Sequence, residues 1–285
     1  MADNPIYADE QPSPAAESHS SEIPRLRLQG ISKSFGAVRA LNNVDFEVFA
    51  GEVVGLVGDN GAGKSTLIKA ISGVGPADEG EIFLEEQPVK ITSPQIANHL
   101  GIETVYQDLA LCDNLDVVGN LFLGHEERTP FWTINEVAME ARALEVLRTL
   151  DVKLPSARAV VSTLSGGQRQ SIAVAKTILR NAKVVLLDEP TAALGVAQTR
   201  QVLNLILRLR EQRLAVVVIS HNLADVFEVV DRVVVMRLGR RVATFDVKTA
   251  TPEQVVAAIT GAEIGGILQT NDTNGNNGNG SAGGR

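Results

Sequence analysis

A glycine-rich loop at residues 58–65 of this 285-residue chain has residue types and spacing suited to binding phosphate. It matches the P-loop pattern of a glycine, four residues and then Gly-Lys-Ser. An apolar run at 53–57 precedes the loop, and a helical pattern from Lys64 to about Ser72 follows it. Backbone N–H groups and the helix N-terminus can therefore converge on phosphate. The residues expected to contact a nucleotide are Gly58, Asp59, Asn60, Gly61, Ala62, Gly63, Lys64, Ser65 and Thr66.

Two side chains of the loop have distinct expected tasks. Lys64 would reach the β and γ phosphates of ATP, and the Ser65 hydroxyl would bind Mg²⁺. Glycines are needed around them because larger side chains would hold the anion away from the backbone. The alternative is a glycine-rich turn before an ordinary helix, and further motifs are needed to decide against it.

Two carboxylates follow a second apolar run. Val184 to Leu187 is expected to be a buried strand, and Asp188 and Glu189 come directly after it. This is the end of the strand where α/β proteins bind ligands. Asp188 is suited to hold Mg²⁺ through a water molecule, and Glu189 to act as the general base toward the attacking water. Alone, the pair could equally be a solvated acidic end of a strand.

A third motif, Leu-Ser-Gly-Gly-Gln at residues 164–168, is the most discriminating of the three. A hydroxyl and two glycines open a helical segment, so this helix N-terminus can present N–H groups to an anion. Ser165, Gly166, Gly167 and Gln168 are the expected contacts. In isolation, such a sequence would more often be a loop or a helix cap.

Taken together and in this order, the motifs resemble those of the ATPases of the ABC transporter family, over almost all of the part expected to fold. The resemblance implies that Gln107 senses Mg²⁺ and the attacking water and touches a membrane partner. It further implies that His221 contacts the γ-phosphate and that Phe35 stacks on adenine. Without the resemblance, Gln107 would be a surface residue, His221 a cap or surface group, and Phe35 a core residue.

The resemblance also implies a dimer. In such ATPases two nucleotide-binding domains enclose two ATP molecules, and each site joins one domain's P-loop to the other's signature motif. This chain has one P-loop and one stretch that resembles the signature motif, residues 164–168, so its partner is a second copy or a related subunit. Gly195 stands where the family usually has an aspartate, which puts one contact across the dimer in doubt and leaves the acidic pair and His221 untouched.

A longer stretch indicates the cargo. The segments 93–102, 105–111 and 120–124 look like those of the ATPases of ribose, xylose and fructose importers. This likeness implies a transmembrane permease and, indirectly, a substrate-binding protein as partners. An exporter ATPase, or a soluble ABC protein acting on ribosomes or DNA, is the alternative. The soluble class usually has two tandem ATPase domains or long coiled coils, which this sequence lacks.

Short apolar runs predict the strands that hold these motifs. Residues 25–29 and 44–48 alternate apolar with polar side chains, which is typical of strands with one exposed face. Continuous apolar runs are typical of central parallel strands covered on both faces. The apolar runs are 53–57, 184–187, 216–219 and 233–236. One more strand is expected at 101–106, directly before Gln107.

Helical patterns alternate with these strands. One stripe consists of Val202, Leu205, Ile206 and Leu209, and a second of Val137, Ala141, Leu144 and Leu147. Alternating strands and helices predict an α/β fold. We expect a P-loop NTPase core with an antiparallel β subdomain and an inserted helical subdomain at about 94–180.

Composition sets the outer limits of these expectations. A Pro-, Ser- and acid-rich tail at 1–22 and a Gly/Asn-rich tail at 269–285 are expected to be disordered, leaving 23–268 as the ATP-binding domain. The net charge of −8 disfavours nucleic acid as a partner. Neither an apolar run long enough to span a bilayer nor a secretory signal is present, so we expect a peripheral subunit at the cytoplasmic face of the cell membrane.

Overall fold

The computed structural model describes residues 22–262. The two tails expected to be disordered lie outside these residues, apart from Glu22, and so do residues 263–268 of the expected ATP-binding domain. Within the described range, no helix is both long and apolar enough to span a membrane.

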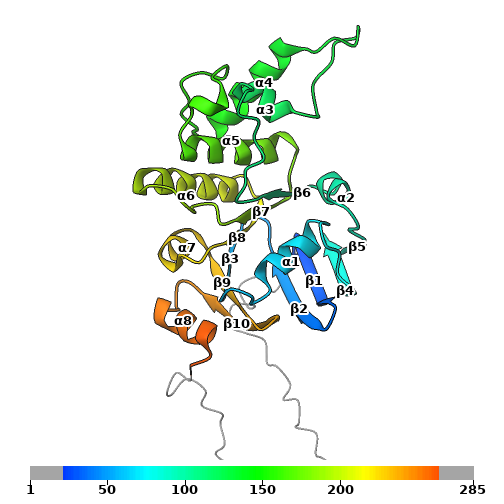
Figure 1. The fold of residues 1–285 in the computed structure, drawn as a ribbon, viewed down its shortest axis with the longest axis vertical. Coiled ribbons are helices and arrows are strands. Elements are labelled where there is room, and N and C mark those ends of the chain that lie inside the picture. The colour runs from blue at the N-terminus through cyan, green and yellow to red at the C-terminus, as the bar shows by residue number, and fades with distance from the viewer. Residues whose placement is uncertain (1–21, 263–285) are drawn as a thin grey trace, which may run out of the picture.

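Six strands form the main sheet, in the order β10-β9-β3-β8-β7-β6 (Figure 1). The strands are β3 (Val53–Val57), β6 (Ile102–Val105), β7 (Val184–Asp188), β8 (Ala215–Ile219), β9 (Arg232–Arg237) and β10 (Arg240–Asp246). All neighbours are parallel except β10, which pairs antiparallel with β9 at one edge. The apolar runs predicted as central strands are confirmed, and their carboxyl ends share one edge of the sheet.

Helices cover both faces of this sheet, which is why its strands are apolar throughout. Val53 belongs to the same core as α6 (Val196–Glu211) and α7 (Leu223–Val229). Val54, one residue later and so on the opposite face, belongs to the core that includes α1 (Lys64–Ile71). The stripe predicted for α6 is buried as expected. The last described helix, α8 (Pro252–Thr260), packs on β9 and β10.

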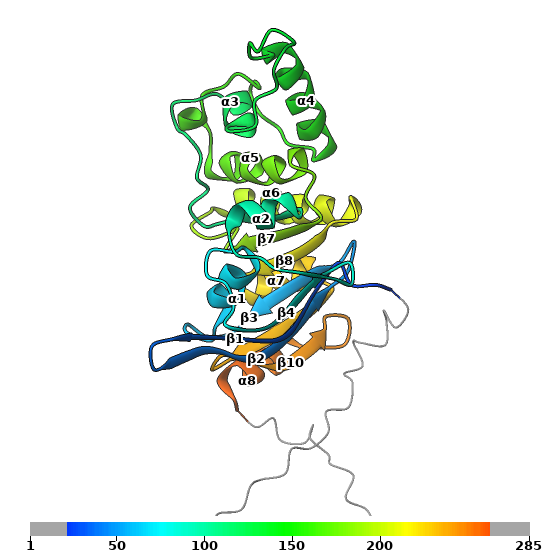
Figure 2. The ribbon, with the colours of Figure 1, turned by 90° about the vertical axis from the view of Figure 1, so that its right-hand side faces the viewer.

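A second, antiparallel sheet has the order β2-β1-β4-β5. Its strands are β1 (Leu26–Phe35), β2 (Val38–Val48), β4 (Glu79–Leu84) and β5 (Gln87–Val89). Leu26, Leu28 and Ile31 share a core with α1, so this sheet covers the α1 side of the molecule (Figure 2). The predicted strand 25–29 is only the first half of β1. Register shifts after Leu28 interrupt the alternation that the sequence pattern relied on.

The helical part extends from one end of the molecule (Figure 1). It contains α3 (Val117–Phe122), α4 (Glu136–Thr149), a short 3₁₀ turn (Val161–Thr163) and α5 (Gly166–Leu179). The expected start of the helical subdomain near Pro94 is wrong. α2 (Pro94–His99) packs on β6, and β6 pairs in parallel with β7 in the main sheet. Both therefore belong to the core, and the helical part begins after Val105.

Two members of the stripe predicted for α4, Leu144 and Leu147, face the core, but the other two are exposed. Val137 is 81% exposed, whereas Met139, Ala143 and Leu147 form the buried face. These three follow the i, i+4, i+8 spacing that aligns residues along one helix face. The predicted stripe drew members from two faces of α4, because apolar residues occur on both of them.

Candidate active site

The main sheet brings the predicted catalytic residues to one edge. The P-loop follows β3, His221 follows β8 after one serine, Asp188 ends β7, and Gln107 lies two residues beyond the end of β6. These four strands are consecutive neighbours and parallel. Residues from four distant parts of the sequence therefore lie side by side, at the end of the sheet where α/β proteins bind ligands.

Two glycines allow the P-loop to pack closely against its neighbours. Gly58 has φ 148°, and a Cβ there would lie 2.2 Å from the carbonyl oxygen of Met236 in β9. Gly63 caps α1 at φ 102°, and a Cβ there would lie 2.8 Å from the carbonyl oxygen of Ala40 in β2. The loop is thus held between the two sheets in a conformation that L side chains rarely adopt.

Lys64 lies folded over its own loop. It is 9% exposed, and its Nζ donates to the carbonyl oxygens of Gly58 at 2.6 Å and Asp59 at 3.0 Å. Burial lowers the pKa of Lys64, and the carboxylates of Glu189, Asp59 and Asp188 oppose that shift. A partly desolvated ammonium group held by carbonyls is well suited to donate to a phosphate oxygen instead.

Glu189 of the acidic pair contacts His221. The Glu189 side chain is 19% exposed, and its Oε2 lies 2.8 Å from Nδ1 of His221. Burial raises the pKa of Asp188, the charge of Glu189 adds to that rise, and Lys64 opposes it. Glu189 has φ 51°, and its N–H donates to the carbonyl of Ile219 in β8. A carboxylate held against an imidazole is a suitable acid–base pair.

One further contact was not foreseen from the sequence. The Thr191 hydroxyl donates to Oδ2 of Asp225 at 2.8 Å, which ties the turn after Glu189 to α7, the helix that follows His221. A threonine after Glu-Pro and an aspartate in a helical pattern carry no signal for this bond. Only the neighbouring positions of β7 and β8 bring them together.

Oxygen donors from three segments fit a hard cation such as Mg²⁺. Ser65 is exposed at the start of α1, Asp188 offers a carboxylate, and Gln107 is exposed beyond β6. The residues predicted to hold Mg²⁺ thus lie at or after the ends of β3, β7 and β6, three strands that end at the same edge.

The signature residues lie elsewhere in the chain. Ser165 caps α5, and Oγ accepts from the Gln168 N–H at 3.3 Å while Oε1 of Gln168 accepts from the Ser165 N–H at 3.0 Å. α6 and β7 lie between α5 and the P-loop helix α1 (Figures 1 and 2). Gly166 and Gly167 pack against Leu194, Gln198 and Gln201 around the start of α6. Within one chain these residues are not brought to the P-loop.

Phe35 is not a core residue. It ends β1 in the hairpin with β2 and is 55% exposed, with Nζ of Lys33 at 5.7 Å from its ring centroid. Ala40 of the same hairpin lies against Gly63 of the P-loop. The hairpin therefore stands next to the phosphate loop and presents an open aromatic face.

The family model for ABC transporter proteins matches residues 41–192. The chain belongs to the ABC transporter family. As a member of this family it binds and hydrolyses ATP. The matched range includes the P-loop, Gln107, the signature residues and the acidic pair, whereas Phe35 and His221 lie outside it.

Curated relatives carry the names of sugar-import ATP-binding proteins. The fructose import ATP-binding protein FrcA of Rhizobium meliloti is 47% identical over 85% of this chain and 96% of its own length. The xylose/arabinose import ATP-binding protein XylG of Sulfolobus acidocaldarius is 41% identical over 85% of this chain and 96% of its own. Against the ribose import ATP-binding protein RbsA of Clostridium perfringens, 37% identical over 85% of this chain, the match spans 48% of the relative.

Solved ABC cassettes share the fold. An ATP-binding cassette of an ABC transporter in its ADP conformation superimposes with a TM-score of 0.72 at 27% identity, covering 83% of this chain and 95% of that one. A dimeric cassette bound to ADP and phosphate has a TM-score of 0.65 at 25% identity, covering 78% and 98% respectively. An α/β P-loop core with an antiparallel sheet and a helical part is therefore confirmed for this ABC protein.

Gly195, the departure from the family pattern, lies at the start of α6. Its φ of −75° is ordinary for any residue, and nothing lies within 4 Å of where a Cβ would stand. Its N–H donates to Oε1 of Gln198 at 3.3 Å. The fold leaves room for the usual aspartate, so the substitution removes a carboxylate without any backbone need for glycine.

Replacing Gly58 by alanine tests the packing of the P-loop. Gly58→Ala is expected to destabilise the chain more than Gly36→Ala, because Gly36 has φ 58° but open space around it. The left-handed backbone costs about 1–2 kcal/mol at Gly36, and the clash at Gly58 adds about 1–3 kcal/mol. Urea unfolding of both variants measures the difference. Equal losses would show that the contact with Met236 is not tight.

Proposed function

We propose that this chain is the subunit that drives a monosaccharide importer by hydrolysing ATP. The contact between Glu189 and His221, at the strand ends next to the P-loop, is the observation that carries the chemistry. The likeness to fructose, xylose/arabinose and ribose import proteins supports the cargo class. The ATP hydrolysis proposed for this site does not depend on which of these sugars is carried.

The site residues divide the reaction among them. Glu189 accepts a proton from water as the water oxygen bonds to the γ-phosphorus and the bond to the bridging oxygen of ADP breaks. His221 holds the Glu189 carboxylate and contacts the γ-phosphate, while Lys64 leaves its carbonyl partners for the phosphate oxygens. Mg²⁺, held by Ser65, Asp188 and Gln107, would neutralise phosphate charge. Phe35 would stack on adenine.

A second ATPase subunit completes each site. α5 has 14 residues, and its N-terminus is capped by Ser165, which is exposed. Its N–H groups can therefore face a phosphate held by another chain. A dimeric cassette among the structural relatives supports this arrangement. The partner is either a second copy or a related subunit.

The membrane partner is a permease, and a substrate-binding protein delivers the sugar to it. Gln107 lies where the chain passes from the main sheet into the helical part, so a permease that touches this segment would sense the state of the site. This arrangement puts the chain at the cytoplasmic face of the membrane.

Glu189→Gln tests the general base. The amide keeps the shape of the carboxylate and loses its basicity, so ATP hydrolysis is expected to fall about 10²–10⁴-fold while ATP still binds. Glu211→Gln, at the exposed end of α6, is the matched control and keeps normal turnover. Turnover and nucleotide affinity are measured on the purified chain. Near-normal turnover in Glu189→Gln would remove Glu189 from this role.

Mixing two inactive chains tests the shared site. In a dimer of Lys64→Ala with Ser165→Arg, both defects fall on one site and the other site is intact. ATP hydrolysis is therefore expected only in the mixture. Mixing Lys64→Ala with the Lys64→Ala/Ser165→Arg double variant is the control, since no dimer then has an intact P-loop. Full activity of Ser165→Arg alone, at a dilution where only monomers are detected, would contradict sharing.

Reconstituting the complex that copurifies with this chain tests the cargo. In proteoliposomes, binding protein loaded with fructose, xylose or ribose is expected to accelerate ATP hydrolysis several-fold, since loaded receptor promotes the permease transition. The disaccharide maltose is the control and has no effect. Copurification with a permease but no binding protein would indicate an exporter, and no membrane partner would indicate a soluble ABC ATPase.

A further inference from the structure

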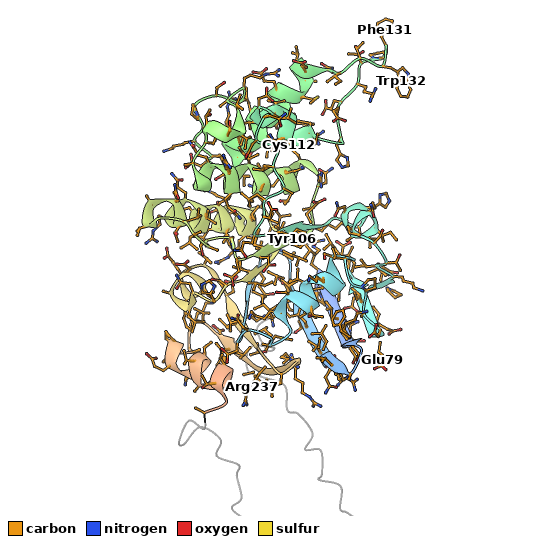
Figure 3. The ribbon with its side chains drawn as sticks, in the orientation of Figure 1. Glu79, Tyr106, Cys112, Phe131, Trp132 and Arg237 are labelled. Atoms are coloured by element: carbon orange, nitrogen blue, oxygen red, sulfur yellow. The ribbon has the colours of Figure 1, made fainter. Side chains whose placement is uncertain are left out.

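Tyr106 occupies a position that the proposed chemistry does not use. It stands between β6 and Gln107 and is half-buried near the junction of the sheet and the helical part (Figure 3). Its hydroxyl donates to Oγ of Ser72 at 3.1 Å. Ser72 is the C-cap of α1 and is 3% exposed, and its own hydroxyl donates weakly to the carbonyl of Lys69 at 3.4 Å.

This hydrogen bond joins two segments that face the same site. α1 begins at Lys64 and Ser65 and ends at Ile71, next to Ser72. Gln107 is the residue directly after Tyr106, and it is exposed, so packing does not fix its side chain. The bond therefore ties the helix that carries Ser65 to the strand end that carries Gln107.

Tyr106 also borders a cavity of about 180 Å³. Residues Ala173, Lys176 and Thr177 of α5 line the same cavity. The residue thus lies between α1 on one side and a space lined by α5 on the other. A phenylalanine would fill this position almost equally well, so the hydroxyl contributes the bond to Ser72 and little else.

We propose that Tyr106 is a positioning residue for the magnesium site, and that its bond to Ser72 sets the distance between Gln107 and Ser65. The proposal rests on the function given above, in which both residues hold Mg²⁺. Without the bond, the strand end is free to shift relative to α1, and the two oxygen donors no longer meet one cation. ATP itself keeps its P-loop contacts. Loss of the bond is therefore expected to reduce only the gain in ATP affinity that Mg²⁺ brings.

The test is a double-mutant cycle read by binding. Tyr106→Phe, Ser72→Ala and the combination are prepared in the Glu189→Gln chain, where hydrolysis is expected to be slow. Calorimetry gives the Kd for ATP in EDTA and in saturating Mg²⁺. The Kd in EDTA divided by the Kd in Mg²⁺ measures how much Mg²⁺ improves ATP binding. This ratio is expected to fall about two- to ten-fold in each single variant, the effect of one lost hydrogen bond. The double variant falls no further, because both changes remove the same bond.

Controls separate this inference from the proposed function. Thr149→Val removes a hydroxyl that donates to the Glu145 carbonyl on α4, and it leaves the ratio unchanged. Gln107→Ala lowers the ratio. If Gln107→Ala has no effect, the magnesium role of Gln107 fails and this inference fails with it. If Gln107→Ala lowers the ratio and Tyr106→Phe does not, or if the single effects add, only the inference is overturned.

Discussion

Parallel pairing of β3, β8, β7 and β6 is the constraint on which the site depends. In a parallel sheet each strand ends at the same edge, so four loops that are distant in the sequence meet there. The P-loop, His221, the acidic pair and Gln107 need no contacts of their own to be brought together. A strand slipped by one residue would turn its core residues outward and also move its catalytic end. Burial of the valine-rich strands therefore fixes the register and the chemistry together.

The charges at this edge are held ready for an anion before one arrives. Lys64 and Asp188 are both partly removed from solvent, which lowers the pKa of Lys64 and raises the pKa of Asp188. The charge of each group opposes the shift of the other. Donors and acceptors that are already desolvated need little reorganisation when phosphate enters. The carbonyls that hold Nζ of Lys64 are a provisional partner, since they carry only partial charge. This arrangement favours exchange of Lys64 from backbone to ligand.

The sequence alone predicted correctly those elements in which one local pattern determines one local structure. The apolar runs around Val53 and Val216 gave strands because buried strands need no alternation, and the P-loop glycines matched a backbone that only glycine adopts easily. Prediction failed where tertiary packing decides: α4 has apolar residues on two faces, and the strand expected before Gln107 belongs to the main sheet and not to a helical subdomain that starts near Pro94. Bonds between distant side chains, such as Thr191 with Asp225, leave no trace in a single sequence. The roles of Lys64 and Glu189 followed from residue chemistry, whereas those of Gln107, His221 and Phe35 came from the resemblance to a family.

The route of the chain through the helical part has a consequence for how such proteins diversify. The chain leaves the main sheet after Val105 and returns at Val184, in the strand that pairs with the one it left. Everything between is an excursion that the sheet does not need for its own pairing. Insertions, deletions or surface changes between Gln107 and Ser165 alter what the protein meets, while the hydrolytic edge and the residues that complete the partner's site stay the same. Selection for a new partner can therefore act on one contiguous segment without disturbing the reaction that powers it.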